Sequence, residues 1–196
     1  MRRSIVVLGV LLAAGGAVSA CGQGGGPLSA EAVGRAQGWG VDPALVYVTK
    51  VEGYSPAAGG AGVYGDAGYQ GVYTSRTGAD LRLTVERRTL TAQTCPEVPI
   101  PAAAPGAPVE CTADGEAWRR SSGDRHEYAL PVGDLTVMAS GPSATPVDVL
   151  RQAATEAHPA SSDEILEVLP PPPGGPVERG DITGDNAPDN HVGPGG

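Results

Sequence analysis

Alternating apolar and polar residues run through several short stretches in the middle of the chain. Leu81, Leu83 and Val85 alternate with polar neighbours, and the same period of two recurs further along. This period predicts strands with one buried face and one polar face. Two stretches rich in Val, Tyr and Thr are also predicted strands, and Ser-Ser-Gly-Asp at 121–124 predicts a hairpin turn. The predicted strands are residues 46–54, 69–75, 81–86, 125–130 and 135–140.

The period changes to that of a helix near the C-terminal end. Thr145 and Pro146 have the residue types of a helix N-cap and first helical position, and apolar residues then recur on one face. The dipeptide at 158–159, His-Pro, is expected to end this helix. A second capping pattern begins at Ser161, with Glu164 three residues later. The predicted helices are residues 30–37, 147–157 and 165–169.

Strands followed by helices predict an α+β fold. We expect a single small domain over residues 28–169, with an antiparallel sheet of about five or six strands and C-terminal helices packed on it. Residues 170–196 are rich in Pro, Gly and Asp and hold few large apolar residues. Such a segment cannot bury enough surface to offset its chain entropy, so a disordered tail is predicted.

The first residues carry the features of an export signal. Arg2 and Arg3 precede an apolar or small stretch from Ile5 to Val18, which is shorter than the ~20 residues a membrane-spanning helix needs. The stretch closes with Val-Ser-Ala-Cys at 18–21, which resembles the lipobox of bacterial lipoproteins.

This resemblance implies a signal peptide over residues 1–20 and a lipid anchor on Cys21. In that family the cysteine thiol receives diacylglycerol, the signal is removed, and the cysteine becomes the first residue. Residues 21–27 would then be a lipidated, Gly-rich tether, with acyl chains such as palmitate holding the protein at the outer, extracytoplasmic face of the cell membrane. Abundant Arg beside a single Lys, together with the lipobox, suggests an actinobacterial source.

The charge of the chain narrows the choice of partner. Removing the predicted signal takes away two of the 13 basic residues and none of the 22 acidic ones. The mature chain therefore has 11 basic against 22 acidic residues, a net charge of −11, which repels nucleic acid and other polyanions.

Two cysteines remain once Cys21 is assigned to the lipid. Cys95 and Cys111 are an even pair in a chain predicted to lie outside the cell, so a disulfide is expected between them. The loop that it closes holds five prolines. This stiff loop is either a recognition surface or an irregular connection that the disulfide stabilises.

Familiar catalytic patterns are incomplete. Residues 60–65 fit G-x-G-x-x-G but run toward a predicted strand instead of a helix, so we expect a loop and no dinucleotide. His126 and Glu127 begin H-E-x-x-H, but Leu130 stands where the second His belongs. No G-x-S-x-G is present. We therefore expect a protein that is not an enzyme, with no cofactor and no metal.

Five of the six tyrosines fall within residues 47–73. Tyrosine favours interfaces, so a possible binding face is expected at Tyr47, Tyr54, Tyr64, Tyr69 and Tyr73; strand propensity and half-burial would give the same clustering. The leading hypothesis is a non-catalytic envelope module that binds a protein or a cell-wall component such as a glycan. The alternatives are a carrier of a small apolar ligand between sheet and helices, and an envelope hydrolase with an unrecognised site.

Overall fold

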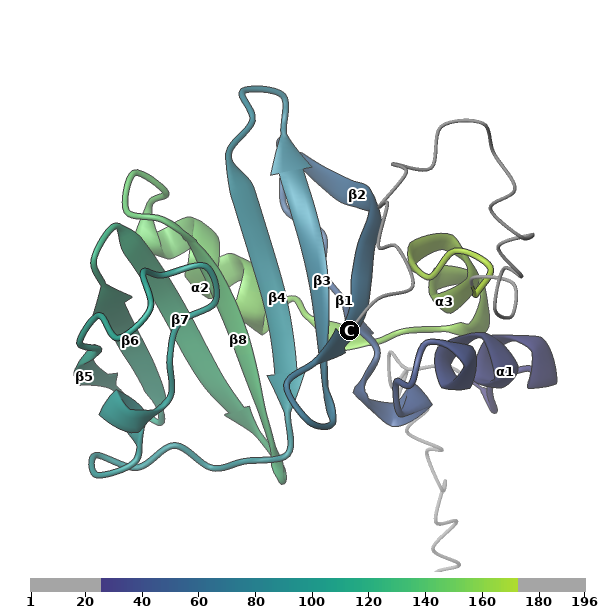
Figure 1. The fold of residues 1–196 in the computed structure, drawn as a ribbon, viewed down its shortest axis with the longest axis horizontal. Helices are drawn as coiled ribbons and strands as arrows, with labels where there is room; N and C mark the ends of the chain where they lie inside the picture. The colour runs from purple at the N-terminus through teal and green to yellow at the C-terminus, as the bar shows by residue number, and fades with distance from the viewer. Residues whose placement is uncertain (1–25, 173–196) are drawn as a thin grey trace, which may run out of the picture.

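The computed structural model describes residues 26–172, which form one α+β domain (Figure 1). Seven antiparallel strands make the main sheet, and a two-stranded sheet lies beside it. The predicted fold class is confirmed, with a larger sheet than expected. The strands are β1 (Tyr47–Val48), β2 (Tyr54–Tyr64), β3 (Gly68–Ser75), β4 (Asp80–Glu86), β5 (Glu110–Asp114), β6 (Ala117–Ser122), β7 (Arg125–Val132), β8 (Leu135–Pro142) and β9 (His158–Pro159).

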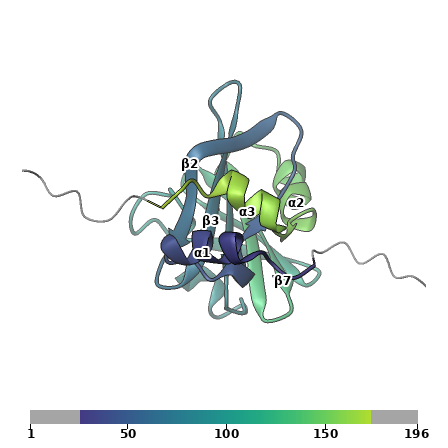
Figure 2. The same cartoon turned by 90° about the vertical axis from the view of Figure 1, so that its right-hand side faces the viewer.

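Three α-helices and two short 3-10 helices complete the described part. Helix α2 packs against β7 and β8, α3 packs against β2, and α1 packs against α3. Figure 2 shows α1 and α3 side by side in front of the sheet. No helix in residues 26–172 is both long enough and apolar enough to cross a membrane. The helices are α1 (Ala30–Gly38), η1 (Pro43–Leu45), η2 (Cys95–Glu97), α2 (Val147–Thr155) and α3 (Ser162–Val168).

The sheet joins two meanders through one long-range pairing. Its strand order is β2-β3-β4-β8-β7-β6-β5, so the last strand of the second meander returns beside β4. Between β4 and β5 the chain runs through residues 87–109, hereafter the strap. The strap contains η2 and no strand, and it covers one face of the sheet.

The two faces of the sheet have different covers. On the helix-covered face, Leu81, Leu83 and Val85 join the main core, as their period of two predicts. On the strap-covered face, a smaller apolar cluster combines strap and strand residues: Leu90, Val98, Ala129 and Met138, with Trp118 packed against it. The sheet is therefore buried on both sides over part of its area.

The predicted capping is confirmed for α3 but not for α2. Ser161 and Glu164 form the predicted reciprocal capping box at the start of α3. At α2, however, the N-cap is Pro146 and no side chain caps the helix, so the predicted role of Thr145 was wrong. The dipeptide at 158–159 follows α2 as expected, and it also pairs with β1.

Two strand predictions fail in the same region. Within the predicted strand 46–54, only Tyr47–Val48, which forms β1, and Tyr54, which begins β2, are paired. Residues 60–65, expected to be a loop, lie mostly in β2. Strand β2 was missed because glycines and Pro56 interrupt its pattern. A register shift between Pro56 and Ala61 accommodates them, and edge strands tolerate such residues.

The predicted signal and most of the predicted tether and tail lie outside the described residues. Cys21 is among them. At the other end, the indole Nε1 of Trp39 donates a hydrogen bond to the carbonyl of Pro170, 2.8 Å away, so the ordered contacts continue to the first tail residue.

Candidate functional site

A cleft of 520 Å³ opens where three separate segments meet. The segments are the β2–β3 turn, the end of β4 with the start of the strap, and the middle of the strap. A cleft of this volume lies in the range of small-ligand sites. We call it the Tyr64–Glu86 cleft; its lining is Tyr64, Gly65, Asp66, Ala67, Gly68, Glu86, Arg87, Arg88, Val98 and Pro99.

Glu86 is the buried acid of this cleft. It is the last residue of β4. Its neighbour Val85 points into the helix-covered core, so the Glu86 side chain lies on the opposite, strap-covered face. Its Oε1 accepts a hydrogen bond from Arg88 Nη2 at 2.9 Å. Its Oε2 is buried and has no partner among the described residues. A buried carboxylate oxygen without a donor is costly, so this atom is an acceptor that the described residues leave unsatisfied.

Gly68 makes room for Glu86. A Cβ added at Gly68 would stand 2.8 Å from Glu86 Cγ and 3.0 Å from two backbone oxygens. Only glycine therefore allows β3 to start so close to the carboxylate. The sequence showed a glycine-rich stretch here, but the reason for this glycine lies in the neighbouring strand.

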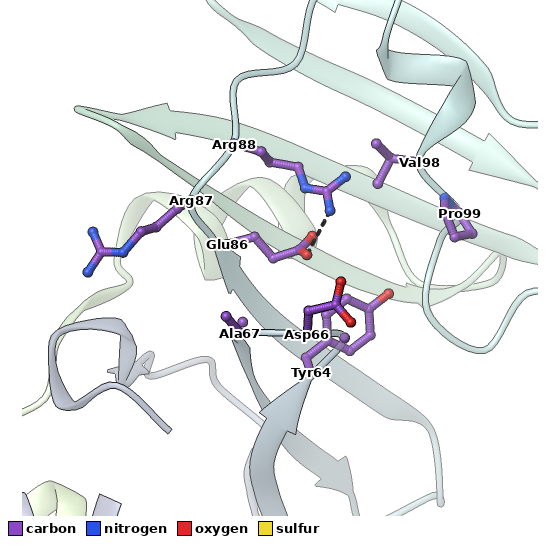
Figure 3. Close-up of a pocket in the computed structure, with 10 residues that line it drawn as sticks. Tyr64, Asp66, Ala67, Glu86, Arg87, Arg88, Val98 and Pro99 are labelled. Atoms are coloured by element: carbon purple, nitrogen blue, oxygen red, sulfur yellow. Dashed lines mark hydrogen bonds and ion pairs between the residues drawn. The ribbon is translucent and has the colours of Figure 1, made fainter. Parts of the chain in front are cut away.

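Polar groups from the β2–β3 turn face Glu86 across the cleft. Figure 3 shows the carboxylates of Glu86 and Asp66 and the phenol oxygen of Tyr64 directed toward the same space. Burial raises the pKa of Tyr64, and the charges of Glu86 and Glu127 raise it further. The phenol therefore stays protonated and can donate a hydrogen bond.

Arg87 lies at the rim and turns away from the cleft (Figure 3). Its guanidinium bonds Asp42 at 2.7 Å and Asp134 at 3.2 Å. A backbone hydrogen bond from Ala44 and the bond from Arg87 lower the pKa of Asp42. Arg87 thus ties the start of the strap to two other loops, and Arg88 is the cation that faces the cleft.

A buried ion pair holds the opposite wall. The guanidinium of Arg120 bonds the carboxylate of Glu127, and both side chains are fully buried. The same guanidinium donates to the carbonyl oxygens of Cys95, at 3.3 Å, and Val98. Burial raises the pKa of Glu127, and the charge of Arg120 opposes that rise. The pair therefore fixes strap backbone over the sheet and positions Val98 at the cleft.

The strap is also closed by a disulfide. Cys95 and Cys111 are bonded, with their Cα atoms 6.4 Å apart, which confirms the predicted pairing. The crosslink joins η2 to β5. Because Val98 and Pro99 directly follow η2, the disulfide limits how far this cleft wall can move.

The five predicted tyrosines do not form one exposed face. Tyr47, Tyr69 and Tyr73 are buried in the main core, and the remaining two, Tyr54 and Tyr64, lie in different clefts. Desolvation by burial, with a smaller effect of Tyr73, raises the pKa of Tyr69. Burial in the core therefore explains most of the clustering along the sequence.

Tyr54 lines a second cleft, of 410 Å³, on the helix side. There the Tyr73 hydroxyl accepts a hydrogen bond from Thr49 N at 3.1 Å. His158 Nε2 lies 3.2 Å from Glu164 Oε1, whose carboxylate is already engaged by the capping box. Several polar groups of this cleft are thus already bonded to other protein groups, and the contact of His158 with Glu164 joins β9 to α3.

The chemistry of the Tyr64–Glu86 cleft suits binding. Residues 26–172 contain no group of three or more His, Cys, Asp or Glu arranged to hold a metal ion. The cleft instead offers acceptors on Glu86 and Asp66, donors on Arg88 and Tyr64, and apolar surface on the strap. The sequence reasoning singled out Tyr64 but missed Glu86 and Arg88, which carry no motif.

Comparisons with protein-family models, with curated proteins and with solved structures found no match for this chain.

Proposed function

We propose that this protein is a lipid-anchored binding module of the bacterial cell envelope, with the Tyr64–Glu86 cleft as its binding site. In this proposal the anchor is Cys21, and the domain acts on the outer face of the membrane without catalysing a reaction. The observation that carries it is the cleft itself, where a buried carboxylate oxygen without a partner lies among donors and apolar walls.

The construction of the cleft supports a role in recognition. Its two walls come from the Tyr-rich segment and from the strap, the two features that the sequence offered as alternative working surfaces. The disulfide and the Arg120–Glu127 pair hold one wall before any ligand arrives. A site held in place in this way lowers the ordering cost of binding.

The apolar-carrier alternative has less support. The 410 Å³ cleft between the sheet and α3 has polar groups among its lining, several of which are already bonded to other protein groups. The space beside Tyr69 measures only 10 Å³, about enough for one water molecule. The hydrolase alternative rests on the two carboxylates of the cleft. A hydrolytic activity that depends on Glu86 would support it.

Site-specific photo-crosslinking in intact cells tests the proposal. A photoreactive phenylalanine analogue replaces Tyr64 in one variant and Tyr54 in the other, and mass spectrometry identifies the adducts. Tyr54 is a matched control, because it is also a half-buried tyrosine of β2 and lines the other cleft. We expect defined adducts from position 64 and none of these from position 54.

Two results would contradict the proposal. Equal adducts from both positions, or adducts only from position 54, would contradict the assignment of the binding site to the Tyr64–Glu86 cleft. A hydrolytic activity of the purified mature chain on envelope glycans, peptides or esters, abolished by Glu86→Gln, would show that the protein is an enzyme.

A further inference from the structure

The buried part of the Tyr64–Glu86 cleft is neutral as a whole. Glu86 is compensated by Arg88 at 2.9 Å, and behind it Glu127 is compensated by Arg120. Asp66 adds a carboxylate at an exposed position of the turn. An anionic ligand would meet Glu86 and an acidic protein, and a cationic ligand would meet Arg88. The charges therefore favour a ligand that is polar but uncharged.

The hydrogen-bonding groups favour neighbouring hydroxyls on that ligand. A carboxylate accepts from an O–H group, and a guanidinium donates to the oxygen of the next one. Glu86 and Arg88 present these two functions next to each other, since they are themselves hydrogen-bonded. Asp66 and the Tyr64 hydroxyl add one acceptor and one donor on the facing wall.

The apolar walls favour a ring with a non-polar face. The Tyr64 ring forms one side, and Val98 and Pro99 form the other (Figure 3). The negative face of an aromatic ring attracts weakly positive C–H groups. A pyranose combines such C–H faces with hydroxyls around its edge, which matches a cleft that is apolar at its sides and polar at its base.

We infer that the Tyr64–Glu86 cleft binds an uncharged saccharide, as found in the neutral parts of envelope glycans. This inference rests on the proposed binding function and names its ligand class. Glu86 and Arg88 read vicinal hydroxyls, Tyr64 and Pro99 hold the ring between them, and Asp66 contacts a hydroxyl at the rim.

The experiment is a binding screen with the mature, lipidated chain purified in detergent. The probes are neutral oligosaccharides of hexoses, pentoses and N-acetylhexosamines, beside an anionic polysaccharide and a basic peptide. We expect at least one neutral oligosaccharide to bind, with an affinity that changes little with salt. Titration calorimetry should show about tenfold weaker binding for Glu86→Gln, because the charge-assisted hydrogen bond is lost.

Three further variants separate the site from the fold. Tyr64→Ala should weaken binding at least as much as Glu86→Gln, whereas the matched Tyr54→Ala should leave it unchanged. Asp66→Asn, at an exposed turn position, tests the same cleft without touching the core and should reduce binding several-fold. Circular dichroism confirms that each variant is folded.

The outcomes distinguish the ligand class from the proposed function. Binding of only the basic peptide or only the anionic polysaccharide, with steep salt dependence, would overturn the saccharide. The saccharide proposal would also be overturned if no saccharide bound. The same holds if saccharide binding were unchanged by Glu86→Gln, Tyr64→Ala and Asp66→Asn. If position 64 nevertheless crosslinks to a protein in cells, the binding function stands and only the ligand class is wrong; without either result, both are wrong.

Discussion

On the strap-covered face, the charges of buried side chains are compensated by specific partners. Asp80 accepts hydrogen bonds from Arg125 at 2.8 and 2.9 Å and from Arg82 at 2.8 Å. Arg125 is only 5 % exposed, so the Asp80 carboxylate is needed to compensate its buried charge. The bond from Arg125, followed by that from Arg82, lowers the pKa of Asp80 even though burial opposes the change.

Asp80→Asn should therefore destabilise the protein by about 2 kcal/mol at neutral pH, because Arg125 loses its charged partner. The ionised carboxylate stabilises the fold above the ordinary Asp pKa of 3.8, and this contribution is lost as the pH falls through the lower folded-state pKa. Urea unfolding of both proteins over a pH series measures this. A difference that stayed constant down to the most acidic pH would contradict the assignment.

Substitutions of Arg120 and Glu127 can separate the effect of this ion pair on stability from its effect on the position of the strap. Arg120→Met should cost about 3–5 kcal/mol, since it leaves Glu127 buried without its counter-charge. Combining it with Glu127→Met should recover a large part of that loss. The double variant still lacks the hydrogen bonds to the carbonyls of Cys95 and Val98, so ligand binding should remain weak. Calorimetry and urea unfolding measure the two effects; full recovery of binding would contradict the positioning role.

Among the elements, the strap decides the shape of the cleft. It has no strand to pair with the sheet; a disulfide, a buried guanidinium and a small apolar cluster hold it instead. By contrast, the β2–β3 turn on the facing wall is held by the backbone pairing of a hairpin. The two walls should therefore respond differently to reduction.

Replacing Cys95 and Cys111 together by Ala should lower the free energy of unfolding by about 3 kcal/mol in the chain-entropy account of a loop of this length. Binding should weaken as well, because Val98 and Pro99 are less restrained. Urea unfolding with and without a thiol reductant provides the control: reduction should bring the wild type to the level of the double variant and leave the variant unchanged. A reductant-insensitive wild type would contradict this.

At the scale of the whole molecule, the domain brings together residues that the sequence keeps far apart. The β4–β8 pairing joins the two meanders into one sheet. The strap then crosses the sheet and places Val98 opposite Tyr64 in the cleft. The helices occupy the other face (Figures 1 and 2). The proposed site and the helix-covered core therefore lie on opposite sides of the sheet.

The proposed lipid anchor on Cys21 predicts where the protein resides in the cell. Cys21→Ser should abolish incorporation of labelled palmitate and move the protein from the membrane fraction to the soluble extracytoplasmic fraction, because stable anchoring depends on the acyl chains. Fractionation of the native host measures this, with Cys95→Ala as the control that keeps Cys21. A Cys21→Ser variant that stayed equally membrane-bound would contradict the anchor.

Some parts of the structure could be read from local sequence alone. The period of two in β4, β7 and β8 places alternate residues on opposite faces whatever the partner strand. The capping box of α3 needs only Ser161 and Glu164, three residues apart. The disulfide followed from an even pair of cysteines. In each case the physical cause acts over a few residues or leaves one choice of partner.

Other features depended on tertiary structure. Strand β2 persists despite Pro56 and its glycines because β3 supplies the hydrogen bonds. The tyrosines were divided between core and clefts by the packing of strands, not by their spacing. Glu86 and Arg88 gained their roles from Gly68 and from the strap lying opposite. The sequence thus determined strands β4, β7 and β8, one helix cap and the crosslink, whereas the cleft exists only because long-range pairing brings its walls together.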